Sequence, residues 1–75
     1  MREGILKFNE ENNRYGLWDY DHEYWIDNGF HCGECLDVFV SGRWIHSRME
    51  MGMQRQYYLV GTKFEKNLEN ILCRI

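Results

Sequence analysis

The sequence lacks the features that would place it in a membrane. Its longest apolar runs are Val38–Val40 and Tyr57–Val60, whereas a membrane-spanning helix needs about 20 consecutive apolar residues. The first residues, Met1–Gly4, lead into only two strongly apolar side chains, so the hydrophobic region of a secretory signal is missing as well. We therefore expect a cytoplasmic protein without a membrane span.

Proline is absent and cysteine is scarce. With no proline and no low-complexity segment, collagen-like and repetitive architectures are excluded. The chain has three cysteines, and an odd number leaves at least one thiol without a partner. In a cytoplasmic protein this argues against a disulfide framework and predicts reduced thiols.

An excess of positive charge is also absent. Nine Lys and Arg residues face twelve Asp and Glu residues, which gives a formal net charge of −3. This balance disfavours loose attraction to the phosphate backbone of nucleic acids. The arginines gather between residues 43 and 55 and several acids lie between residues 19 and 27, so opposite faces could differ in sign.

What the chain does have is an aromatic-rich, globular composition. Its 75 residues are 44% hydrophobic and 28% charged, which predicts one folded domain over residues 1–75. Three tryptophans, five tyrosines and four phenylalanines indicate a small core built on large rings. Because so small a core leaves little stability in reserve, a metal ion, a ligand or a second subunit in a homodimer would add to it.

Two hairpins are predicted from alternating apolar segments. The first joins residues 4–8 to residues 14–18 through the polar cluster Asn9–Asn13, whose asparagines tolerate the positive φ of tight turns. The second joins residues 36–40 to residues 43–49 through Ser41-Gly42. A two-residue turn at that point places Phe39 opposite Trp44 and Asp37 opposite His46.

The second hairpin has two different faces. Leu36, Val38 and Ile45 are predicted to face the core, since side chains alternate along a strand. The opposite face carries Cys35, Asp37, Phe39, Trp44, His46 and Arg48.

The remaining segments complete an all-β expectation. Residues 19–27 are expected to form a loop with a short strand, and residues 55–60 another strand. Residues 63–75 fit either a helix or a short helical turn followed by a strand. We therefore expect a small antiparallel SH3-like barrel or a strongly bent sheet, with a short helical turn near the C-terminus.

Short apolar and glycine-containing segments over most of the chain resemble a domain family of unknown function. The similarity covers Gly4–Phe8, Arg14–Leu17, Gly33–Val38, Gly42–Ile45, Arg48–Glu50, Tyr57–Gly61 and Leu68–Ile75. Members of that family are small proteins of bacteria, their phages and mobile elements, and the resemblance implies no activity. The acidic and aromatic segment Asp19–Asp27 and the Cys32/Cys35 pair differ from the family pattern.

A zinc site is a weaker alternative suggested by His31-Cys32-Gly33-Glu34-Cys35. Two thiolates separated by two residues can bind one zinc ion through a tight turn, but tetrahedral zinc needs two more ligands. His46 is the nearest candidate because it lies on the same hairpin face as Cys35. The simpler interpretation is that Cys32 and Cys35 are small residues flanking a turn.

The outer hairpin face is the preferred contact surface. Phe39 and Trp44 would form an aromatic platform able to stack on a base, a nucleotide ring or a side chain of a partner. The alternative is that a tightly wrapped sheet covers both faces and makes Trp44 a core residue. Asp19–Asp27 is interpreted as a second contact loop or as a solvated loop that closes one end of the domain. The predicted binding residues are Phe39, Trp44, His46, Arg48, Tyr57, Trp25, Tyr24 and Asp21.

No catalytic motif is present. Ser41 and Ser47 lie outside any nucleophile motif, no glycine-rich segment opens a helix, and no enzymatic activity is expected. The first hypothesis, which rests mainly on the family resemblance, is a phage or mobile-element accessory protein that binds and inhibits a bacterial target such as a defence protein. The second is a binder of a nucleotide or nucleic acid through Phe39, Trp44, Tyr57 and the arginines.

Overall fold

The computed structural model describes residues 1–75 as one antiparallel seven-stranded sheet without a helix. The strands are β1 (Glu3–Asn9), β2 (Arg14–Asp19), β3 (Tyr24–Asp27), β4 (Cys35–Val40), β5 (Arg43–Met51), β6 (Tyr57–Leu59) and β7 (Leu72–Arg74). Their order across the sheet is β3-β2-β1-β7-β4-β5-β6. The structure contains no helix that could cross a membrane.

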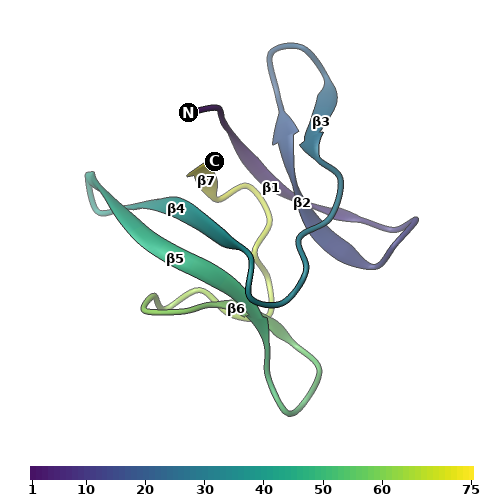
Figure 1. The fold of residues 1–75 in the computed structure, drawn as a ribbon, viewed down its shortest axis with the longest axis vertical. Coiled ribbons are helices and arrows are strands. Elements are labelled where there is room, and N and C mark those ends of the chain that lie inside the picture. Colours follow the sequence, from purple (N-terminus) through teal and green to yellow (C-terminus); the bar gives the residue numbers. More distant parts are fainter.

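The sheet consists of two three-stranded meanders joined by the last strand. Figure 1 shows β1, β2 and β3 on one side and β4, β5 and β6 on the other, with the C-terminal strand β7 between them. Cys73 of β7 pairs with Gly4 of β1 on one side and with Val38 of β4 on the other. The chain ends also meet, since Arg2 and Ile75 exchange two backbone hydrogen bonds of 2.7 and 3.0 Å.

The core lies on the inner face of this sheet. Ten buried residues form one cluster to which both meanders, β7 and the connecting segments contribute: Leu6, Tyr15, Leu17, Phe30, Leu36, Val38, Met49, Leu59, Leu68 and Cys73. All of them except Phe30 and Leu68 lie in strands and follow the alternation of those strands, because a side chain next to a buried one points to the other face. Two meanders thereby share one core.

The all-β prediction is confirmed, whereas a closed barrel does not form. The sheet order ends at β3 on one side and β6 on the other, so both strands remain edges of an open sheet. The short strand expected within residues 19–27 is present as β3.

The predicted helical turn near the C-terminus is wrong. Phe64, Leu68 and Ile71 have helical spacing, but Lys66 and Asn70 have positive φ values of 67°, which interrupt a right-handed helix. The backbone also bonds to strands: Lys66 N donates to Tyr57 O at 2.9 Å and Asn70 N to Leu6 O at 2.8 Å. The periodic apolar residues therefore reach the core through turns.

Candidate functional site

The outer face of β4, β5 and β7 is set by the register of the second hairpin. Asp37 pairs with His46 and Phe39 with Trp44, which confirms the register expected from the two-residue turn. Leu36 and Val38 are buried on the inner face as predicted. Ile45 is only half-buried and lies outside the core cluster.

Phe39 and Trp44 form an edge-to-face pair on this outer face. Their ring centroids are 5.1 Å apart with an interplanar angle of 63°. Phe39 is 39% exposed and Trp44 is half-buried, so the pair is not sealed inside the protein. The guanidinium of Arg74 lies 4.2 Å from the centroid of a Trp44 ring, a cation–π distance.

Asp37 hydrogen-bonds to two side chains beside the aromatic pair. Arg74 Nε donates to Asp37 Oδ2 at 3.1 Å, and His46 Nδ1 lies 3.0 Å from Asp37 Oδ1. These hydrogen bonds, that of His46 first and that of Arg74 second, lower the pKa of Asp37 below its ordinary value. The carboxylate thereby orients the ring of His46 while leaving its side chain 74% exposed.

The same pairing recurs at the other histidines. His22 contacts Asp19 at 3.1 Å and His31 contacts Glu34 at 2.9 Å. In both cases a hydrogen bond from the histidine's own backbone N–H is the main cause of the lowered carboxyl pKa. Both contacts belong to exposed turns.

We expect Asp37→Asn to make the free energy of unfolding depend less steeply on pH in the acidic range. A carboxyl whose folded pKa is lowered stabilises the fold above its unfolded pKa of about 3.9 and loses that contribution as the pH falls through the folded value. Urea unfolding of wild type and variant between about pH 5 and pH 2 measures the difference. Asp21→Asn is the control, because the exposed Asp21 carboxylate accepts no hydrogen bond. Equal slopes in all three proteins would contradict the assignment.

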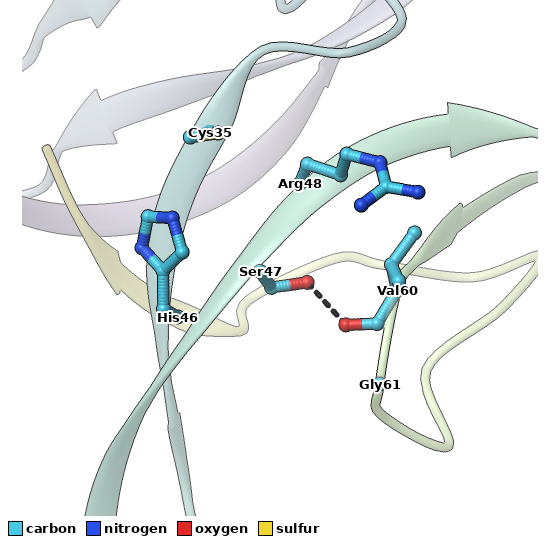
Figure 2. Close-up of a pocket in the computed structure, with 6 residues that line it drawn as sticks. All are labelled: Cys35, His46, Ser47, Arg48, Val60 and Gly61. Carbon is cyan, nitrogen blue, oxygen red and sulfur yellow. Dashed lines mark hydrogen bonds between the residues drawn. The ribbon is translucent and has the colours of Figure 1, made fainter.

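A small pocket lies farther along β5, where β6 ends. Six residues line its cavity of about 180 Å³: Cys35, His46, Ser47, Arg48, Val60 and Gly61. Ser47 Oγ donates to Val60 O at 2.6 Å, and Arg48 Nε donates to Glu50 Oε2 at 3.0 Å. Figure 2 shows the guanidinium of Arg48 reaching toward Val60. No carboxylate belongs to the lining.

The candidate zinc ligands are only partly brought together. Cys35 and His46 both line this pocket, whereas Cys32 does not. No group of three or more His, Cys, Asp or Glu side chains is placed to hold a metal ion. Two hydrogen bonds close the turn around Gly33: one joins His31 Nδ1 and Glu34 Oε1, and the other runs from Glu34 N to His31 O.

Alkylation is expected to distinguish the three free thiols. Cys32 and Cys35 are exposed, whereas Cys73 is buried and burial raises its pKa to about 12. Since the thiolate is the reactive form, we expect two fast additions of iodoacetamide to native protein and a third only on unfolding. Mass spectrometry counts the additions and peptide mapping assigns them. Fast labelling of Cys73 in native protein would contradict the placement of β7 in the core.

The other predicted contact residues lie elsewhere. Tyr57 packs on the inner side, with its ring 5.9 Å from that of Tyr15 and its hydroxyl donating to Asn13 O at 3.0 Å. It is therefore separated from Phe39 and Trp44. Tyr24 and Trp25 belong to β3 at the opposite edge of the sheet, and Asp21 is exposed in the preceding turn.

A second set of aromatic and cationic side chains lies along β1, β2 and β3. The ring centroid of Trp25 lies 5.0 Å from that of Trp18, and Lys7 Nζ lies 4.3 Å from the Trp18 ring. Arg2 hydrogen-bonds to the hydroxyl of Tyr24. Trp18 and Trp44 thus lie on strand positions that alternate with buried residues.

Sequence reasoning missed Arg74 and Lys7. Lys7 directly follows the core residue Leu6, so strict alternation in the first hairpin could have placed it on the outer face. No such signal was available for Arg74, because the sequence pattern of residues 63–75 fitted a helix as well as a strand.

The comparisons with known proteins agree with this fold. A family model described as "Domain of unknown function (DUF5348)" matches residues 4–75, which include nearly all of β1 and every later strand. The chain belongs to this family. The family of unknown function expected from the sequence is thereby confirmed, while phage and mobile-element sources stay a prediction.

A protein from Ruminococcus gnavus, solved as a crystal structure, has the same fold. The two chains are 39% identical with a TM-score of 0.80, and the match covers 99% of this chain and 100% of the other. No curated protein matches the chain.

Proposed function

We propose that this domain is a non-enzymatic binding module that contacts a protein partner through the outer face of β4, β5 and β7. The observation that carries the proposal is the part-exposed Phe39–Trp44 pair with Arg74 stacked on it. Tryptophan, tyrosine and arginine dominate the energetics of protein interfaces. Here the aromatic pair and the arginine are already held in place before a partner arrives.

A binding role also accounts for Asp37 and His46 better than catalysis does. An acid–base pair needs a group free to accept or release a proton next to a substrate. Asp37 instead accepts hydrogen bonds from both His46 and Arg74, which is typical of a network that orients side chains.

The narrower form of the proposal names a target. The family resemblance favours an accessory protein of a phage or mobile element that blocks a cytoplasmic bacterial defence protein by covering its surface. Small size and a negative net charge fit such an inhibitor, because charge complementarity sets partner choice.

Affinity capture from a bacterial lysate tests the contact face. A Trp44→Ala variant is expected to retain the fold and to lose roughly 30-fold in affinity for the captured protein, the loss typical of a hot-spot residue. Met53→Ala is the control, since Met53 is fully exposed in the turn between β5 and β6. Undiminished capture by Trp44→Ala would remove this face from the interface.

The stacked arginine favours one second candidate, a nucleotide or a short single strand. Base stacking on aromatic rings and phosphate contacts to arginine use the same residue types. Titration of tryptophan fluorescence with nucleotides and short oligonucleotides distinguishes the two. A saturable change that Trp44→Ala abolishes would favour the nucleotide, and no change would favour a protein target.

A further inference from the structure

β5 has an open backbone edge beside the proposed contact face. The strand runs over nine residues, but β6 pairs only with Met49, Glu50 and Met51. In Figure 1, β5 extends well beyond β6 toward its turn with β4. Residues 43–47 are therefore paired on one side only.

The hydrogen-bond pattern shows which backbone groups face this open edge. Met49 donates to Glu34 O and accepts from Gly33 N on the β4 side, whereas Arg48 O accepts from Val60 N on the other side. Bonding directions alternate along a strand, so the N–H and C=O groups of Trp44 and His46 point away from β4. No strand pairs with them there. Such a row can accept an additional strand.

The pocket continues this edge at the point where β6 stops. Val60 and Gly61 form one wall, and Ser47 and Arg48 of β5 form part of the other. Gly61 has a φ of 79°, which turns the chain away after Val60. A strand added along residues 43–47 would thus prolong the line of β6 and place one side chain in the pocket.

Three basic side chains, those of Arg43, His46 and Arg48, lie along this edge and keep nitrogen atoms without a hydrogen-bond partner. Arg48 is held by Glu50 through Nε, and His46 is held by Asp37 through Nδ1, which leaves the Arg48 Nη atoms and His46 Nε2 available. Arg43 is exposed and has no ion pair. With no carboxylate in the pocket lining, this arrangement complements carboxylate side chains.

We propose that the open edge of β5 receives an extended segment of a partner protein that carries carboxylates at alternate positions. This inference rests on the proposed function and specifies the partner's chemistry. A second copy fits less well, because twofold pairing of two such edges would gather the His46 and Arg48 side chains of both chains on one face. A carboxylate opposite His46 would lie diagonally across from Arg48, because Val60 already lies opposite Arg48. The intervening side chains would lie on the inner face.

The probe is a hexapeptide of alternating valine and glutamate, with alternating valine and lysine as the matched control. Titration into ¹⁵N-labelled protein is expected to shift the Trp44 and His46 amide signals, and hydrogen exchange at both amides is expected to slow about tenfold as they gain partners. The lysine peptide is expected to leave both amides unchanged. Failure of the glutamate peptide to protect them at millimolar concentration, or equal protection by the lysine peptide, would overturn the proposal.

Two variants isolate the backbone contribution. His46→Ala and His46→Pro both remove the imidazole, but only proline removes the N–H that faces the open edge. A proline there deletes no sheet hydrogen bond, and edge positions tolerate it. The proline variant is expected to bind the glutamate peptide about tenfold more weakly than the alanine variant, since one hydrogen bond is lost. Equal affinities would contradict strand addition.

The outcomes also separate this inference from the proposed function. Trp44→Ala could abolish capture of a protein target while the Trp44 and His46 amides stay unprotected in the wild-type complex. That result would support the contact face and would overturn strand addition at the edge. If both amides are already protected in the free protein in a concentration-dependent way, the edge belongs to a second copy and the inference is overturned.

Discussion

Replacing Leu17 by alanine is expected to lower the free energy of unfolding by about 3–5 kcal/mol. Leu17 is fully buried and lies opposite the equally buried Leu6 on the inner face. Removing three carbon atoms from such a site loses transfer free energy and leaves a cavity that the neighbours fill only in part. Since native domains have total stabilities of only about 5–15 kcal/mol, and a small one lies near the lower limit, much of this protein would unfold.

Urea denaturation followed by circular dichroism measures this loss, and Leu72→Ala is the matched control. Leu72 is half-buried beside Ile5 and lies outside the core cluster. Its truncation is expected to cost about 1 kcal/mol. Similar losses in the two variants would mean that the inner face is not the main core.

Replacing Tyr15 by alanine is expected to cost about 3–5 kcal/mol, as for other buried rings. Tyr15 is 7% exposed and packs edge-to-face against Phe8 at 5.2 Å and Tyr57 at 5.9 Å. Its hydroxyl accepts a bond from Leu68 N at 3.2 Å and donates to Lys66 O at 3.3 Å. One side chain of β2 thus anchors the turns that precede β7.

Tyr15→Phe separates the hydroxyl from the ring. Phenylalanine keeps the packing but leaves the Leu68 N–H without its acceptor, for an expected loss of about 1–3 kcal/mol. Tyr58→Phe is the control, because Tyr58 is half-buried and its hydroxyl makes no hydrogen bond; its expected effect is within about 0.5 kcal/mol. A loss in Tyr15→Phe no greater than in the control would show that these hydrogen bonds do not hold the turns.

Both hairpins could be predicted because their information is local. Ser41 and Gly42 have positive φ values of 50° and 81°, as a two-residue hairpin turn requires, and that turn sets every pair from Val40–Arg43 to Cys35–Arg48. The aromatic pair and the Asp37–His46 contact follow directly from this register. The Phe39–Trp44 part of the candidate site was therefore accessible from sequence.

The contribution of Arg74 to that site could not be predicted from the sequence, because it depends on β7, a strand far from β4 and β5 along the chain. β7 has only three residues, too few for a periodic pattern, and it is positioned by pairing with β1 and β4 rather than by its own propensity. Arg74 reaches Trp44 and Asp37 only through this pairing. Tyr57 was misplaced for a related reason, since its face depends on the register of β6 against the far end of β5.

Local residue patterns were enough to place the turns of the two hairpins, the alternation of residues along their strands and the side chains that oppose one another within each. These properties depend on residues a few positions apart, for which turn geometry and side-chain period are sufficient. Three features follow only from the folded arrangement: the sheet stays open, residues 63–71 form turns bonded to strands instead of a helix, and Arg74 completes the outer face. Those outcomes come from backbone hydrogen bonds and burial between different strands and turns, most of them far apart in sequence, where pairing in the folded state outweighs local periodicity.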